Sequence, residues 1–572
     1  MAATRITRFL VFSFVVLSPS LPSLAFEDHS CRILPSDDAW PNESVWDAFN
    51  TSVDGRLIKV VPDGLPCHDP EYNENLCEVV RENWLVPQFH SGRPGSIMNS
   101  LLYNRSCDPF APRETPCTMR NVVEYSVNVS QAEHIIKAVQ FVKEHNIRFV
   151  VKNTGHDYMG KSTGTGALSV WMHNFQGIEW VPDYVSTGYT GPAIKAPAGI
   201  QGKDLATFAG ARGHAIVSGE CPSVGFAGGY IQGGGHSIIT SAYGMAADQT
   251  LEFEVVTMQG EHLVATPTQN EDLYWALSGG GGGTYAVVLS VTVKVFPDGP
   301  LTLGFLNFTE VRSETYWQAV AAYNAIIPDL TSSRTTVFAS YASNYFEINH
   351  MVAVNQTGQE LTAVIRPFLD SLDDLGIQYN FSTRSDVRYL DVLEFLGGIL
   401  PSIGDQVLAT RLLPRSLWDN ETGIASVVDA TRQVLEGFSG VVVADLSFKP
   451  PTRLPGDPQN AVLPAWRESQ RAVFSVVLYA GNETQAEASM AVQKVSQAIS
   501  TFREISPGSG AYLNEGDLLE PNFKDAFYGP NYDRLLNIKD KWDPDQILYG
   551  STAVGGDRWR EDEDGRLCKV VG

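Results

Sequence analysis

The chain has 572 residues, with 41 basic and 65 acidic side chains, a formal net charge of −24 and 43% apolar residues. This length is enough for two or three domains with real cores, and the acidic balance excludes the basic surface that binds nucleic acid or anionic membranes. The apolar fraction also excludes a disordered chain, and the seven cysteines are too few for a disulfide-built scaffold. The composition therefore predicts a large, soluble, globular protein.

The N-terminus has the pattern of a signal peptide. Arg5 and Arg8 precede an apolar run over residues 9–17, and Ser23 and Ala25 are the small residues of a cleavage site. The apolar run is shorter than the ~20 residues of a membrane-spanning helix. We therefore expect residues 1–25 to be removed and the mature chain, beginning near Phe26, to be secreted or held in the secretory-pathway lumen.

Sequons and cysteines fit that compartment. Any one N-x-[ST] sequon can arise by chance, but a signal peptide favours several real N-glycans among the nine asparagines Asn42, Asn50, Asn104, Asn128, Asn307, Asn355, Asn380, Asn420 and Asn482. Six peripheral cysteines can form three bridges, and the natural pairs are Cys67/Cys77, Cys107/Cys117 and Cys31/Cys568. Cys221 is left over, either as a buried inert thiol or as a functional one.

The middle of the chain begins with α/β patterning. Residues 26–115 form a Cys-rich extension, and residues 130–133 then match a capping box before apolar residues at helical spacing. The β-rich run 148–151 predicts a buried strand directly after this helix. Short strands with glycine-rich turns continue to about residue 297.

A second domain is expected over residues 300–500. Residues 314–327 and 423–438 are amphipathic and predict helices, while residues 441–447 and 472–479 predict strands. From residue 511 onward the tail is again rich in turns and aromatic residues.

Three glycine-rich clusters, at residues 153–166, 225–235 and 279–283, are the motifs most able to carry chemistry. Glycine lets backbone N–H groups approach a phosphate closely without any basic side chain. A Rossmann domain is disfavoured because no G-x-G-x-x-G opens a helix after a first strand. A serine hydrolase elbow would need glycine where Ile239 stands, and the histidines lack the spacing of a catalytic metal site.

Several of these segments together resemble the berberine-bridge-enzyme-like FAD-linked oxidases, most closely their secreted fungal branch. The residues that carry the resemblance are NTGHDYMGKSTG at 153–164, CPSVG through GGGH at 221–236, NEDLYWAL at 270–277, YLNE at 512–515 and the segment 532–544. The resemblance covers nearly the whole mature chain.

The resemblance implies an α+β fold. A PCMH-type (vanillyl-alcohol-oxidase-like) FAD-binding domain would occupy residues 116–299. An α/β substrate domain, with an antiparallel sheet backed by helices, would occupy residues 300–500. The C-terminal segment 501–572 would return to the FAD domain.

The resemblance also implies two covalent bonds to the cofactor. His156 matches the histidine that bonds the flavin 8α-methyl group, and Cys221 matches the cysteine that bonds flavin C6 in bicovalent members. An imidazole and a thiolate are suitable nucleophiles for an electrophilic cofactor position. This reading also explains why Cys221 is the odd cysteine.

Further cofactor contacts follow from the same resemblance. The pyrophosphate would lie against the first glycine loop, and the flavin against the second loop and the tail; the matching residues are Asn153, Thr154, Gly155, Asp157, Gly160, Ser162, Thr163, Gly225, Gly228, Gly234, Asp248 and Asn514. Asp248 could equally be a turn residue. Val224 matches a position where valine admits oxygen to the flavin, although plain core packing is the alternative.

Candidates for the catalytic base are Tyr158, Tyr512 and His236. A tyrosine has an ordinary pKa near 10, so it needs a cationic or hydrogen-bonding neighbour to act as a base at neutral pH. His236 either lines the substrate pocket or has a structural role.

The expected function is that of an oxygen-dependent flavin oxidase. An alcohol, amine or C–H centre of a small molecule, such as a secondary metabolite, would transfer hydride to flavin N5, and O2 would then be reduced to hydrogen peroxide. The alternatives are an oligosaccharide oxidase of the same family and a redox-neutral cyclase or isomerase. A binding protein on an inactive scaffold is disfavoured by the presence of His156, Cys221 and Val224.

Overall fold

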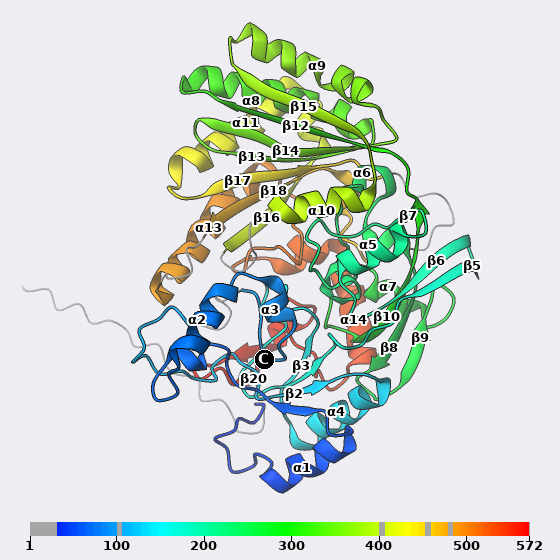
Figure 1. Cartoon of the computed structure of the whole chain (residues 1–572), viewed down its shortest axis with the longest axis vertical. Coiled ribbons are helices and arrows are strands. Elements are labelled where there is room, and N and C mark those ends of the chain that lie inside the picture. Colours follow the sequence, from blue (N-terminus) through cyan, green and yellow to red (C-terminus); the bar gives the residue numbers. More distant parts are fainter. Residues whose placement is uncertain (1–30, 100–105, 400–405, 452–458, 479–483, 571–572) are drawn as a thin grey trace, which may run out of the picture.

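The computed structural model describes residues 31–99, 106–399, 406–451, 459–478 and 484–570. Two bodies pack together: one is built by residues up to about 297 and by the C-terminal tail, and the other by the segment between them (Figure 1). The expected signal peptide and the sequons at Asn104 and Asn482 lie outside the described residues. No helix within the described part of the chain is long and apolar enough to cross a membrane.

Three disulfides hold the N-terminal extension together. Its short elements are α1 (Glu43–Ser52), β1 (Leu57–Lys59), η1 (Leu65–Cys67), α2 (Glu74–Asn83) and α3 (Pro87–Ser91). The bridges are Cys67–Cys77, Cys107–Cys117 and Cys31–Cys568, the last joining the two ends of the described chain. The predicted pairing is confirmed, and Cys221 is the free cysteine of the described residues.

The first body contains two sheets. A four-stranded sheet has the order β1, β2 (Tyr125–Asn128), β4 (Leu168–Trp171) and β3 (Phe149–Lys152), with β2 and β3 both parallel to β4. A five-stranded antiparallel sheet has the order β5 (Glu179–Ser186), β6 (Tyr189–Pro197), β10 (Ala286–Lys294), β8 (Thr250–Thr257) and β9 (His262–Ala265).

Helix α4 (Ala132–His145) connects β2 to β3 and buries Ile135, Val139 and Val142 against the first sheet. The predicted helix and the strand after it are therefore present. The predicted capping box does not form: Gln131 is the N-cap and makes no side-chain bond. The reason is local, because the Ser130 N–H donates to Nδ1 of His134 instead.

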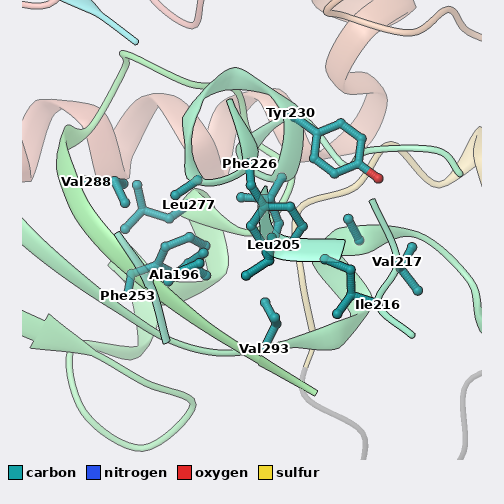
Figure 2. Close-up of a cluster of buried hydrophobic side chains, with 14 of the residues drawn as sticks. Ala196, Leu205, Ile216, Val217, Phe226, Tyr230, Phe253, Leu277, Val288 and Val293 are labelled. Carbon is teal, nitrogen blue, oxygen red and sulfur yellow. The ribbon is translucent and has the colours of Figure 1, made fainter. Parts of the chain in front are cut away.

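The core of the first body lies between the five-stranded sheet and the segments that carry the glycine loops. Phe253, Val288 and Val293 point from the sheet toward Leu205 of α5 (Gly202–Gly210) and Phe226 of the short helix η3 (Phe226–Tyr230) (Figure 2). Helix α7 (Glu271–Leu277) contributes Leu277 to the same cluster. This packing holds the loop that carries Cys221 against a rigid sheet.

The second body is a seven-stranded antiparallel sheet backed by helices. The strand order is β15 (Tyr379–Val387), β12 (Leu301–Thr309), β14 (Tyr345–Val354), β13 (Thr335–Tyr341), β17 (Val442–Ser447), β18 (Ser469–Leu478) and β16 (Gln406–Pro414). The main helices are α8 (Ser313–Ser332), α9 (Gly358–Asp374), α11 (Glu421–Gly437) and α13 (Gln485–Ile505). The predicted elements at 314–327, 423–438, 441–447 and 472–479 are all found, shifted by a few residues.

The two faces of this sheet have different neighbours. Val443 and Val473 alternate with Ala444 and Phe474 along β17 and β18, as the period of two in a strand requires. Val443 and Val473 pack under the helices, whereas Ala444 and Phe474 face the first body. The sheet therefore presents an apolar surface to the glycine loops.

The tail returns to the first body along β16. Leu412 donates its N–H to Gly510 O, and Tyr512 donates its N–H to Thr410 Oγ1. Helix α14 (Tyr532–Trp542) then packs beside α7. Short elements complete the two bodies: β7 (His214–Ala215), α6 (Thr240–Tyr243), β11 (Phe296–Pro297), α10 (Tyr389–Ile399), α12 (Ala465–Glu468), β19 (Trp559–Glu561) and β20 (Leu567–Lys569).

Candidate active site

A cavity of about 410 Å³ lies between the two bodies. One wall consists of loops of the first body, within residues 151–162, 219–232 and 282–288. The opposite wall is the free face of the seven-stranded sheet, and the tail closes one side with Tyr512, Asn514 and Glu515. The volume is in the range of ligand-binding sites.

The two residues expected to attach a cofactor lie beside each other in the loop wall. His156 Nε2 is 4.0 Å from Cys221 Sγ, and Ser223 Oγ lies 2.8 Å from the former and 3.4 Å from the latter. Burial lowers the pKa of His156 to about 3, so its imidazole is neutral and keeps a nucleophilic nitrogen. Burial raises the pKa of Cys221, so the thiol is its resting form.

The glycine loops leave main chain rather than side chains along the cavity. Gly155 has φ +88° and Gly283 has φ +63°, a region that strains any other residue. A Cβ on Gly225 would overlap Asn153, and a Cβ on Gly282 would lie 2.8 Å from Gly229 Cα. These positions therefore form a cradle for a ligand that is held by backbone amides.

Three lining residues carry a buried polar atom that has no hydrogen-bond partner within the described structure. These atoms are Asn153 Oδ1, Gln232 Oε1 and His236 Nδ1. A buried polar atom without a partner costs about 1–3 kcal/mol, so a ligand or water that completes the hydrogen bonds of these three would be stabilised here. With the glycine cradle and the neutral His156, they fit a bound dinucleotide such as FAD.

His236 is paired with a carboxylate in the cavity wall. Its Nε2 lies 3.2 Å from Glu515 Oε2, and its ring meets the Tyr512 ring edge-on at 5.3 Å between centroids. Burial alone would lower the pKa of His236, but the charge and hydrogen bond of Glu515, with the charge of Glu220, raise it above 6.5. An imidazole held in this way is suited to proton transfer.

A second imidazole–carboxylate pair joins the two bodies. His350 of β14 places Nε2 3.3 Å from Oε1 of Glu220, the residue before Cys221. Burial opposes ionisation of Glu220, but the charge and hydrogen bond of His350, with the charge of His236, lower its pKa. Glu220 therefore remains a carboxylate beside Cys221.

Both candidate tyrosines line the cavity and keep their protons. Tyr158 Oη accepts a 2.7 Å hydrogen bond from Gln406, and Tyr512 Oη accepts a 2.9 Å bond from Asn514 Nδ2, which also donates to Gly229 O. Burial, reinforced by the charge of Glu515, raises the pKa of both phenols well above 10. Their role at neutral pH is therefore to form hydrogen bonds rather than to act as free bases.

The sheet wall is almost wholly apolar. Gln406 is the one polar side chain that the described part of this sheet contributes to the cavity; the others are Phe338, Leu408, Ala444, Phe474 and Val476. A ligand against this wall gains by burying carbon rather than by hydrogen bonding.

Most of the residues predicted from sequence line this one cavity, but four do not: Gly160, Thr163, Gly234 and Asp248. Gly160 and Gly234 take φ of +75° and +113°, so they shape their loops instead. Asp248 pairs with Arg467 at 2.6 Å and accepts from Asn460 and from the Met245 N–H. These contacts are those expected of a turn residue, the alternative that the sequence left open for Asp248.

The sequence analysis did not single out several polar residues that line or contact the cavity, among them Lys161, Glu220, Ser223, Gln232, Gln406 and Glu515. Glu220, Ser223 and Glu515 adjoin or nearly adjoin Cys221 and Asn514, so the neighbours of chosen residues were the available signal. No local sequence pattern predicts Gln406 as a site residue, because its hydrogen-bond partner Tyr158 is 248 residues away.

Comparison with known proteins identifies the family of this chain. Residues 123–266 match the FAD binding domain family, and residues 511–554 match the berberine and berberine-like family. The FAD-linked oxidoreductase patO of Aspergillus clavatus is 40% identical over 575 residues, covering 99% of this chain and 100% of its own. The bifunctional decalin synthase calF of Penicillium decumbens is 41% identical, covering 98% and 99%.

A crystal structure shows the same fold. The VAO-type flavoprotein MtVAO615 from Myceliophthora thermophila C1 superposes with a TM-score of 0.90 at 39% identity, covering 95% of this chain and 100% of that one. The mixed architecture of helices and antiparallel sheets, with a VAO-type FAD-binding domain, is thereby confirmed. The chain belongs to the berberine-bridge-enzyme-like FAD-linked oxidoreductases.

Proposed function

We propose that this chain is a secreted oxidase that carries FAD on both His156 and Cys221 and oxidises an alcohol, amine or C–H centre of a carbon-rich small molecule. Bound FAD would supply the hydride acceptor and, once reduced, the site at which O2 is converted to hydrogen peroxide. The observation that carries the proposal is the 4.0 Å approach of His156 and Cys221 in the wall of the cavity that also holds the His236–Glu515 pair.

The attachment residues are prepared by their surroundings. His156 is neutral, so its ring can bond an electrophilic carbon without first losing a proton. Ser223 Oγ contacts both His156 and Cys221 and thereby orients them toward one ligand. Val224 lines the same cavity, where it would leave room for oxygen.

His236 is the proposed acceptor of the substrate proton. Glu515 stabilises the positive charge that forms on the ring, while Tyr158 and Tyr512 hold the substrate by hydrogen bonds. This assignment replaces a tyrosine-centred base, because the pKa of both phenols is raised in this cavity.

The apolar sheet wall supports a carbon-rich substrate rather than an oligosaccharide, which would need many polar partners. A redox-neutral cyclase is the second candidate, since a 41% identical relative is named a decalin synthase. Secretion is supported by the three disulfides, which persist in oxidising compartments.

The test is a substrate screen with two readouts. Fungal polyketide-like and terpenoid alcohols are offered to the purified holoprotein; bleaching of the flavin without oxygen and peroxide release with oxygen identify an oxidase. Conversion of a polyene without either signal identifies a cyclase and overturns the oxidase assignment. The N-terminal sequence of protein from the culture medium tests secretion, and the expected first residue is Phe26.

A further inference from the structure

Lys161 is the one lysine or arginine that lines the cavity within the described structure. The side chain is half-buried at the glycine-loop end. Among the described residues its ammonium group makes no hydrogen bond and no ion pair. A desolvated ammonium group without a partner is unfavourable, so the surroundings of Lys161 indicate what it binds.

The position of the ammonium group follows from two close approaches. A Cβ on Gly550 would lie 2.8 Å from Lys161 Cγ, so the stem is packed against the tail. A Cβ on Gly281 would lie 3.7 Å from Lys161 Nζ, which places the ammonium group beside the third glycine cluster. It therefore lies where main-chain loops, rather than side chains, face the cavity.

The charged neighbours do not neutralise Lys161. Asp157 attracts it, but the two Asp157 oxygens accept from the N–H groups of Met159 and Ser162. Lys539 repels it, although Lys539 is itself paired with Asp543. Burial lowers the pKa of Lys161 to about 8, so the group still carries a charge at neutral pH.

We propose that Lys161 binds the pyrophosphate of FAD and is the cationic side chain of the glycine cradle. This inference rests on the proposed function. Phosphate oxygens accept strong hydrogen bonds from ammonium groups, and the two negative charges of a pyrophosphate match a cavity end that has a cation and backbone amides. An anionic substrate group is the other source of such chemistry, but Glu220 and Glu515 already place negative charge in the cavity.

The experiment compares Lys161→Met with Lys161→Arg, and uses Lys203→Met on α5 as a matched control outside the cavity. Each change is made in the full chain together with His156→Ala and Cys221→Ala, so that binding is non-covalent. Dissociation constants for FAD, ADP and riboflavin are measured by fluorescence quenching or calorimetry. Lys161→Met should weaken FAD and ADP alike by about tenfold or more, the size of one charge-assisted hydrogen bond, and leave riboflavin unchanged.

The outcomes separate the inference from the proposed function. Lys161→Arg should bind FAD and ADP within a few-fold of the parent, because the charge remains. Unchanged FAD and ADP binding in Lys161→Met overturns the inference, as does a change confined to the KM of an anionic substrate. If the triple variant does not fold, the amount of flavin per polypeptide is measured in the single Lys161→Met variant instead. A flavin content equal to that of the wild type overturns the inference. A wild-type protein without flavin overturns the proposed function itself.

Discussion

His156 and His236 line the same cavity, yet their environments shift their pKa values in opposite directions. His156 is half-buried beside a hydroxyl, Ser223, and its desolvation lowers its pKa to about 3. His236 is also half-buried, but Glu515 and Glu220 outweigh desolvation and raise its pKa. The partner of each imidazole therefore decides whether it is a neutral ring, as the proposed attachment of FAD needs, or a ring that can take up a proton.

The largest effect on the cofactor is expected when both proposed attachment residues are removed. His156→Ala combined with Cys221→Ala eliminates both nucleophiles, so all covalent flavin should be lost. The measurement is the visible absorbance of acid-precipitated protein, which should be yellow for the wild type. His262→Ala, on an exposed strand outside the cavity, is the matched control and should stay yellow. A colourless wild-type precipitate would exclude covalent attachment.

The second largest effect is expected at the other imidazole. His236→Ala removes the proton acceptor and should lower kcat by about 10²–10⁴-fold, the usual contribution of a general base. Flavin content should remain that of the wild type, because His236 is not an attachment residue. A kcat within a few-fold of the wild type would exclude His236 as the base.

Glu515→Gln tests the cause of the raised pKa at His236. In the wild type, kcat should fall as the pH drops below the raised pKa, because a protonated imidazole cannot accept a proton. Without the carboxylate the pKa of His236 falls, so this acid limb should move to lower pH by about one unit or more. The pH profile of kcat measures the shift, and Glu261→Gln on an exposed turn is the control. An unmoved acid limb would contradict the assignment.

The smallest effect on the cofactor is expected from Asp248→Asn. This change weakens the ion pair with Arg467 outside the cavity, so it should cost about 1.5–3 kcal/mol of stability for a charged hydrogen bond. The apparent melting temperature should fall while flavin per polypeptide stays constant. Loss of flavin with an unchanged melting temperature would instead show that Asp248 contributes to FAD binding.

Much of the fold could be predicted because its signals are local. Apolar residues at helical spacing predict α4, α8 and α11, and apolar runs predict β17 and β18. Cysteine spacing was sufficient for the pairing of Cys67 with Cys77. The capping box failed because a side chain within the helix, His134, competes for the Ser130 N–H, a choice that spacing alone does not reveal.

The residues of the candidate site likewise fall into those that a local motif predicts and those that only distant contacts bring together. His156 and Cys221 stand in glycine-rich motifs that can be read from a few consecutive residues. The pairing of His236 with Glu515 spans 279 residues, and the bond from Gln406 to Tyr158 spans 248. Such pairs depend on how the tail and the seven-stranded sheet close over the loops, so no local pattern predicts them.

The sequence by itself determined the family, the glycine-rich loops and the pairing of Cys67 with Cys77 and of Cys107 with Cys117, because each depends on residues that are close in the chain. The Cys31–Cys568 bridge spans 537 residues and followed from the sequence only as the pair left over. Tertiary structure alone decided which carboxylate reaches His236, that the pKa of both tyrosines is raised, and that Asp248 pairs with Arg467. It also decided that Lys161 has no hydrogen bond or ion pair with any residue that the structure describes. Burial and charge act through space, and a pKa or an unpaired cation exists only once distant segments have packed together.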